Sequence, residues 1–189
     1  MSEAKKRIIE TTADLMQRNG YCATGLKDII RESGTPRGSL YHYFPGGKED
    51  ITAAALQASG NQFGEALQRC IDLEGSVVKG LVRFIREYAL SFEASGFEKG
   101  CPVATVALET ASNSPVLQAT LQDIFHNWCQ ILINHLVSTG WGEAEARNMA
   151  IFIMSSFNGA LTMSRAAQRI EPMEIVASQI EQLLAQKGA

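Results

Sequence analysis

Residues 26–48, LKDIIRESGTPRGSLYHYFPGGK, decide how the N-terminal part of this chain folds. The stretch contains two short helical patterns separated by Ser33-Gly34, and a glycine is typical of the position that ends a helix. Cationic, hydroxyl and aromatic side chains crowd the second pattern. Two short helices joined by a tight turn, with such side chains on the second, are typical of a helix-turn-helix that inserts its second helix into the DNA major groove.

The limits of the second of these helices follow from its flanking residues. Thr35 is a good N-cap and Pro36 suits the first helical position, so we expect the helix to begin there. It must end near Tyr43, because Phe44 precedes Pro45 and two glycines follow. Together with a preceding amphipathic helix, the stretch forms a three-helix unit, with helices expected at residues 3–18, 25–33 and 36–43.

The second helix of the motif carries side chains suited to DNA. Arg37 lies in its first turn, where it can pair with a guanine edge or a phosphate. Gly38 lowers helix stability, but the missing side chain lets the backbone approach DNA. Ser39 can bond a base or a phosphate, while Tyr41 and His42 carry polar tips suited to phosphates. The apolar residues of the motif are expected to form a small core that holds the two helices at their angle: Ile29, Ile30, Leu40 and Phe44.

The chain beyond the motif is also predicted to be helical, which makes the fold class all-α. Apolar residues recur at helical spacing, and few stretches alternate in the manner of β-strands. We expect helices at residues 48–72, 76–95, 102–111, 114–139, 143–169 and 172–187. The pattern has no break at Lys48, so one helix should be shared by a DNA-binding domain at residues 1–47 and a larger helical domain at residues 48–189.

The charge distribution differs between these two parts. Residues 1–47 contain seven Lys and Arg against five Asp and Glu, a net charge of +2. The whole chain has a net charge of −3, so the other 142 residues carry −5. A mildly basic head on an acidic body fits a small nucleic-acid-binding module joined to another domain.

Other kinds of site find little support in the sequence. The four cysteines are widely spaced, which fits neither a zinc module nor a disulfide framework and favours free thiols in a cytoplasmic protein. No apolar run reaches the roughly 20 residues that span a bilayer. His126 and Cys129 are three residues apart but lack further ligands, so no metal or other cofactor is expected. No nucleophile elbow, phosphate-binding glycine loop or paired-carboxylate motif indicates an enzyme.

Four groups of residues in the first 50 positions match a known pattern: Thr24-Gly25-Leu26-Lys27-Asp28-Ile29, Ser33-Gly34, Gly38-Ser39-Leu40-Tyr41-His42-Tyr43-Phe44 and Lys48-Glu49. In these residues the chain resembles the TetR family of transcriptional regulators. Members of this family are homodimers with an N-terminal three-helix DNA-binding domain and a larger helical domain for ligand binding and dimerisation. Most are repressors that a small molecule releases from DNA.

The resemblance implies a set of DNA contacts. Thr24 and Lys48 would hold phosphates from either side, and Arg37, Ser39, Tyr41 and His42 would face the groove. The full set of candidates is Thr24, Lys27, Thr35, Arg37, Gly38, Ser39, Tyr41, His42 and Lys48. Among these, Lys27 could equally be an ordinary exposed charge on a helix.

Two features depart from the usual pattern of the family. Pro36 stands where a serine that often contacts DNA is usual, and Thr35 is expected to replace that serine as the helix cap. The link from Phe44 to Lys48 is one residue longer than usual. Both features, with Gly100-Cys101-Pro102-Val103, resemble the LmrA/YxaF-type branch. Its members are associated with drug and flavonoid-type inducers, which suggests a flat aromatic ligand.

Aromatic and apolar residues recur on the central predicted helices, and most such stripes form only a core. In a ligand-binding domain, however, some of these positions line a cavity. The candidates are Phe84, Tyr88, Cys101, Val106, Phe125, Trp128, Leu132, Met154 and Phe157. Cys101 also precedes a predicted helix start, where the pKa of a thiol can fall, so redox sensing is an alternative to simple burial.

The last two predicted helices are candidates for a dimer interface. The helix at residues 143–169 is rich in small residues, and the helix at residues 172–187 carries a row of apolar ones. Two copies could form a four-helix seam through these helices, or the helices could pack only within one chain. The resemblance favours the homodimer.

The sequence therefore predicts an all-α, dimeric, cytoplasmic DNA-binding regulator, and not an enzyme. We expect a repressor that binds a palindromic operator and is released by a small apolar or aromatic ligand. Two alternatives stay open: an activator or co-regulator with the same DNA-binding domain, and a helical binding protein or enzyme without a DNA function.

Overall fold

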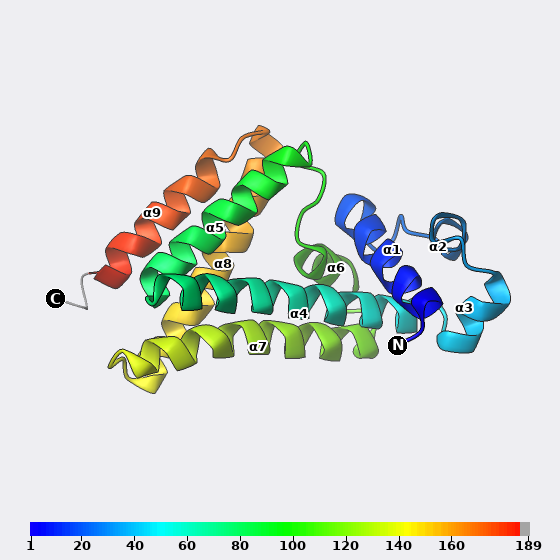
Figure 1. Ribbon diagram of the computed structural model, residues 1–189, viewed down its shortest axis with the longest axis horizontal. Coiled ribbons are helices and arrows are strands. Elements are labelled where there is room, and N and C mark those ends of the chain that lie inside the picture. Colours follow the sequence, from blue (N-terminus) through cyan, green and yellow to red (C-terminus); the bar gives the residue numbers. More distant parts are fainter. Residues whose placement is uncertain (186–189) are drawn as a thin grey trace. The chain divides into compact units, whose positions relative to one another are not determined.

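The computed structural model describes residues 1–185, and these residues form nine α-helices and no β-strand (Figure 1). The helices are α1 (Glu3–Asn19), α2 (Leu26–Ser33), α3 (Arg37–Tyr43), α4 (Lys48–Glu74), α5 (Val77–Ala94), α6 (Pro102–Thr110), α7 (Pro115–Ser138), α8 (Glu143–Ala167) and α9 (Glu171–Ala185). The all-α prediction is confirmed, and the helix ends differ from the predicted ones by at most two residues. Residues 186 and 187 of the last predicted helix lie outside the described residues.

The helices form two compact units, each described by itself. Unit 1 comprises residues 1–61 and 101–124, and unit 2 comprises residues 62–100 and the described residues from 125 onward. Both α4 and α7 pass through the two units, in agreement with the unbroken helical pattern at Lys48. The predicted domain boundary between residues 47 and 48 was placed at the end of the DNA-binding motif, whereas the two units are defined by packing. The predicted boundary therefore stays a prediction.

An apolar core in unit 1 holds the first three helices and the start of α4 together. The buried members of this core are Ile8, Ile9, Leu15, Ile29, Leu40, Phe44 and Ile51. Each such side chain contributes about 1.5–3 kcal/mol by leaving water. The predicted core residues Ile29, Leu40 and Phe44 are confirmed, and Ile30 packs against them while partly buried.

The predicted start of α3 is wrong by one residue. Pro36 is the N-cap rather than the first helical residue, and its carbonyl oxygen accepts the N–H of Ser39 at 3.0 Å and of Leu40 at 3.1 Å. Thr35 does not cap the helix, because its hydroxyl donates back to the carbonyl oxygen of Ser33 at 3.4 Å. The buried Thr35 side chain therefore shapes the turn before α3 instead of satisfying the free N–H groups of the helix.

In unit 2, a single side chain of α8 holds the segment that follows α5. Gly96 and Phe97 both have a left-handed backbone, with φ of 67° and 62°, and the Phe97 ring packs edge-on against Phe92 at 5.2 Å between ring centroids. Arg165 donates through Nε to the Phe97 carbonyl oxygen at 3.1 Å and through a terminal nitrogen to that of Glu98 at 2.6 Å. Its guanidinium carbon also lies 5.7 Å from the centre of the Phe92 ring. These contacts offset the strain of a non-glycine residue in the left-handed region.

Figure 1 shows α9 alongside α5 within unit 2, and α8 also packs against α9. The two helices of the predicted dimer seam are thus neighbours within one chain. In the part of the chain from residue 1 to 185, no helix is both long enough and apolar enough to cross a membrane.

Candidate DNA-binding and ligand sites

The short helix α3 presents most of the candidate DNA contacts on its exposed face. Leu40 is fully buried and anchors the helix, while Arg37, Tyr41 and His42 are exposed and Ser39 is half-buried. The guanidinium carbon of Arg37 lies 5.7 Å from the centre of the Tyr41 ring, one helical turn away. Among residues 1–185, no carboxylate forms an ion pair with Arg37. Its charge is therefore available to a partner outside the chain.

Gly38 has no packing role in the described part of the chain. Apart from its chain neighbours and the nearby backbone of its own helix, no heavy atom lies within 4 Å of the position that a Cβ on this glycine would take. A glycine inside a helix costs about 1 kcal/mol relative to alanine. No contact within the described part of the chain requires a glycine here. A glycine at this position therefore fits a close approach of the α3 backbone to DNA.

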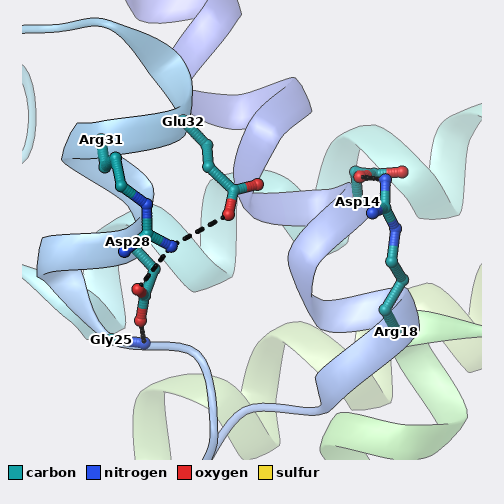
Figure 2. Close-up of polar contacts among 6 residues, drawn as sticks. All are labelled: Asp14, Arg18, Gly25, Asp28, Arg31 and Glu32. Atoms are coloured by element: carbon teal, nitrogen blue, oxygen red, sulfur yellow. Dashed lines mark hydrogen bonds and ion pairs between the residues drawn. The ribbon is translucent and has the colours of Figure 1, made fainter.

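Arg31 on the preceding helix is bound by acids of its own helix (Figure 2). Its guanidinium lies 3.2 Å from Glu32 and 2.8 Å from Asp28, and both raise the pKa of Arg31, Glu32 by a hydrogen bond and Asp28 mainly by its charge. Asp28 also accepts the N–H of Gly25 at 3.3 Å, so it caps α2 as well. On α1, Asp14 and Arg18 form a similar pair (Figure 2). Arg31 therefore offers DNA much less unpaired charge than Arg37.

Two candidate DNA contacts, Thr24 and Thr35, are buried. The Thr24 hydroxyl donates to the carbonyl oxygen of Gly20 at 2.7 Å, and its backbone N–H donates to that of Tyr21 at 3.2 Å. Only 1% of Thr24 and 2% of Thr35 is exposed, so both side chains would have to move to reach a phosphate. Lys27, in contrast, is exposed. Contacts of these three residues with DNA stay predictions.

Lys48 is the first residue of α4 and lies beside the turn between α1 and α2. Its Nζ is 4.0 Å from the centre of the Tyr21 ring, which is a close cation–π contact. Burial lowers the pKa of Lys48, and the nearby Cys22 and the Glu109 carboxylate act in the opposite direction. The ammonium group is thus placed by neighbours from two other segments rather than by α4 alone.

In unit 2, several candidate ligand residues come together in one aromatic cluster around Phe63 of α4. The Phe63 ring stacks on Trp128 at 4.0 Å between centroids and meets Phe84 at 4.8 Å and Phe157 at 5.6 Å edge-on. Tyr88 completes the cluster at 6.1 Å from Phe63, and it is half-buried. Four helices, α4, α5, α7 and α8, each contribute at least one ring. The other candidates of this unit are Phe125, 5.5 Å from Trp128, and the buried Leu132 and Met154.

The residue that follows Phe157 in sequence, Asn158, has a buried polar atom. Asn158 follows Phe157 on α8 and donates through Nδ2 to the carbonyl oxygen of Met154 at 2.9 Å. Its Oδ1 is buried and has no hydrogen-bond partner among the described residues. Such an acceptor costs about 1–3 kcal/mol, so it could serve a donor on a bound molecule.

The last two ligand candidates, Cys101 and Val106, belong to unit 1 and are not part of the aromatic cluster. Both are buried at or near the start of α6. Burial raises the pKa of the Cys101 thiol to about 11, so it stays protonated at neutral pH, which disfavours redox sensing. Within residues 1–185, no group of three His, Cys, Asp or Glu side chains is placed to hold a metal ion.

Comparison with known proteins decides the family. The LmrA/YxaF-like C-terminal domain of transcriptional regulators matches residues 77–179, and the tetR family of bacterial regulatory proteins matches residues 8–55. The HTH-type transcriptional regulator YxaF of Bacillus subtilis is 33% identical over 186 residues, which cover 98% of this chain and 97% of that protein. The chain belongs to the TetR family.

Further relatives agree with membership of the TetR family. LmrA of Bacillus subtilis is 29% identical over 182 residues, covering 96% of this chain and 97% of that protein. Among solved structures, a regulatory protein TetR from Rhodobacter sphaeroides superposes with a TM-score of 0.85 at 20% identity, covering 96% and 98% of the two chains. The reduced form of Escherichia coli NemR gives a TM-score of 0.86 at 18% identity, covering 96% of each chain. The predicted LmrA/YxaF-like branch is confirmed, and these relatives are transcriptional regulators rather than enzymes.

Sequence reasoning missed two residues that are central in this TetR-family structure. Phe63 joins Trp128, Phe84 and Phe157, and its spacing with Leu67 and Ile71 on one face of a predicted helix could have indicated a core position. Glu109 contacts the turn between α1 and α2, and no local sequence pattern predicts this contact. The two segments are 87 and 88 residues apart in sequence, so only tertiary structure reveals it.

Proposed function

We propose that this TetR-family regulator is a cytoplasmic repressor that binds a palindromic operator as a homodimer and is released by a small apolar or aromatic ligand. The observation that carries DNA binding is the exposed face of α3, where Arg37 has no acidic partner in residues 1–185 and Gly38 serves no internal contact. Arg37 and Ser39 are the candidates for base contacts, and Tyr41, His42 and Lys48 are those for phosphates.

Replacing Arg37 with alanine should weaken operator binding by about 1–3 kcal/mol and relax the choice of base at one position of each half-site. The probe is a fluorescent duplex selected from random DNA by the wild-type protein, titrated at fixed salt. Arg31→Ala is the matched control, because it removes the same charge from an arginine already paired with Asp28 and Glu32. Equal losses for both variants would mean that α3 does not read the bases.

The dimer is proposed from apolar side chains that α8 and α9 leave exposed. Phe152 is 48% exposed, Met163 63% and Ile175 55%, which is unusual for side chains of this size on adjacent helices. Pairing α8 and α9 with their copies would bury these residues in a four-helix seam. A two-fold dimer presents two α3 helices, so the operator should contain two half-sites about 34–36 Å apart or at a related spacing.

Phe152→Glu should convert the dimer to a monomer and abolish operator binding, because a charge in an apolar seam has no partner. Sedimentation velocity at several protein concentrations measures the change in mass. Leu73→Glu is the control, since Leu73 is a 63% exposed leucine on α4, outside the proposed seam. A dimer that persists in Phe152→Glu and dissociates in Leu73→Glu would move the interface away from α8 and α9.

Ligand control is proposed from the aromatic cluster around Phe63 and the unpartnered Oδ1 of Asn158. A flat aromatic ligand with a hydrogen-bond donor suits both. It would release DNA only if it binds more tightly to a conformer whose two DNA-binding domains do not fit the operator. NemR of Escherichia coli, named a transcriptional repressor, is 19% identical to this chain and supports repression over activation. Mass spectrometry of small molecules that co-purify with the protein separates a ligand-controlled repressor from a regulator without an inducer.

A further inference from the structure

A carboxylate of α6 holds the turn between α1 and α2 in unit 1. Glu109 accepts the backbone N–H of Tyr21 at 3.2 Å through Oε1 and that of Cys22 at 2.6 Å through Oε2. Hydrogen bonds from neutral amides to an ionised carboxylate are roughly twice as strong as those between neutral groups. One side chain therefore uses both of its oxygens on two consecutive residues of a turn that is far away in sequence.

The turn is shaped to admit this carboxylate. A Cβ on Gly20 would lie 2.1 Å from Oε1 of Glu109, and Gly20 has a left-handed φ of 78° that also favours glycine. Burial works against ionisation of Glu109. The hydrogen bonds from Cys22 and Tyr21 and the charge of Lys48 outweigh it and lower the pKa of the carboxyl. Glu109 is therefore an anion at neutral pH.

The same turn places Lys48. Tyr21 donates its backbone N–H to Glu109, and Nζ of Lys48 lies 4.0 Å from the centre of the Tyr21 ring. A second contact acts on the next residue of α4, because the Ser114 hydroxyl, which follows α6, donates to the carboxylate of Glu49. Glu109 on α6 thus holds the backbone of Tyr21, and Ser114, directly before α7, holds the first turn of α4.

Taken together, the geometry assigns to Glu109 a positioning role in DNA binding: by fixing the Tyr21 turn, it holds the Lys48 ammonium where it can meet an operator phosphate. This inference rests on the proposed function, in which Lys48 contacts the DNA backbone. The Glu109 carboxylate is negative, as the DNA phosphates are, so it would repel DNA if it acted only through its charge. The positioning role and the plain charge effect therefore predict opposite signs when the carboxylate is neutralised.

Glu109→Gln tests whether neutralising the carboxylate lowers or raises the affinity for DNA. A glutamine can accept only one of the two N–H groups, and its own amide nitrogen would face the other donor. We expect operator affinity to fall about tenfold, the factor that corresponds to roughly one hydrogen bond. Glu10→Gln is the matched control, because Glu10 is an exposed carboxylate of unit 1 that pairs only weakly with Lys6, at 3.9 Å. Its neutralisation should leave affinity unchanged or slightly higher. If Glu109→Gln binds the operator as tightly as Glu10→Gln does, the positioning role is wrong.

A thermodynamic cycle with Lys48→Ala separates positioning from loss of folding. If Glu109 acts through Lys48, the double variant should bind DNA no more weakly than Lys48→Ala alone. Glu109→Gln and Lys48→Ala should each reduce the salt slope of binding by about 1. Additive losses, or an unchanged slope in Glu109→Gln, would show a merely structural role. The probe is the duplex selected by the wild-type protein.

Tyr21→Ala keeps the experiment decisive if Glu109→Gln does not fold. This variant removes the ring under the Lys48 ammonium but retains the backbone N–H group that Glu109 accepts. It should give a similar loss of affinity, again without an added effect of Lys48→Ala, and a loss that adds to that of Lys48→Ala overturns the inference. A wild-type protein that selects no duplex at all would instead refute the proposed function.

Discussion

Replacing Trp128 with alanine should lower the free energy of unfolding by about 3–5 kcal/mol, the range for removing a large buried aromatic side chain. Trp128 is 1% exposed, stacks on Phe63 at 4.0 Å and meets Phe125 edge-on at 5.5 Å. Its removal would leave a hole where rings of several helices meet, and the surrounding helices can collapse into it only partly. Urea unfolding followed by far-UV circular dichroism measures the change, at one protein concentration because the midpoint of the proposed dimer would depend on concentration.

Trp128→Phe is the control for this variant. It retains a ring that can stack on Phe63, so its midpoint should lie much nearer to that of the wild-type protein than that of Trp128→Ala. If Trp128→Ala instead leaves the midpoint unchanged, the indole does not pack in a filled core. The residue would then line a space that is open to solvent even without a bound ligand.

Gly80→Ala should destabilise unit 2 by about 3 kcal/mol, near the upper end for overpacking a well-filled interior. A Cβ on Gly80 would lie 2.4 Å from the Cα of Ile71 and 2.7 Å from its backbone nitrogen. These are backbone atoms of α4, which cannot move aside as the end of a side chain can. The gain from alanine in a helix, about 1 kcal/mol, is too small to compensate.

Gly64→Ala is the matched control, since Gly64 is also a buried helical glycine of unit 2. The nearest atom to its added Cβ is the terminal methyl carbon of Ile131 at 3.2 Å, which can shift by a few tenths of an ångström. Stability should therefore change little in either direction. The same urea unfolding experiment compares the two variants, and equal losses would mean that the close contact of α4 and α5 at Gly80 is relaxed in solution.

Local patterns were sufficient to predict most of the helices and the DNA-binding motif. Periodic apolar residues, Asn19-Gly20 and Gly34 mark helix ends correctly, because these signals act within one or two turns of the chain. The start of α3 was predicted one residue too early. Local propensity favours Thr35 as a cap, but in the folded protein its hydroxyl bonds to Ser33 and its side chain is buried. The correct start depends on packing around the turn, which the local pattern does not report.

The candidate sites were predictable in residue type and only partly in placement. Arg37 and Tyr41 lie four residues apart and share an exposed face of α3, as that spacing requires, and His42 is also exposed. Phe84, Trp128 and Phe157 do meet, but around Phe63, and Cys101 and Val106 belong to the other unit. Spacing on one helix identifies a face. It does not identify which faces of different helices meet.

The all-α class and the resemblance of residues 24–49 to the TetR family can both be read from the amino-acid sequence, because helix caps, helical periodicity and the residues of one short motif are local properties. The contacts that residues 26–48 make with the rest of the chain cannot be read in this way. The hydrogen bonds from Tyr21 and Cys22 to Glu109 and the contact of Lys48 with Tyr21 join segments far apart in sequence. Such contacts form where packing of apolar faces brings distant segments together, and the free energy of that packing belongs to the whole core rather than to any stretch of the chain.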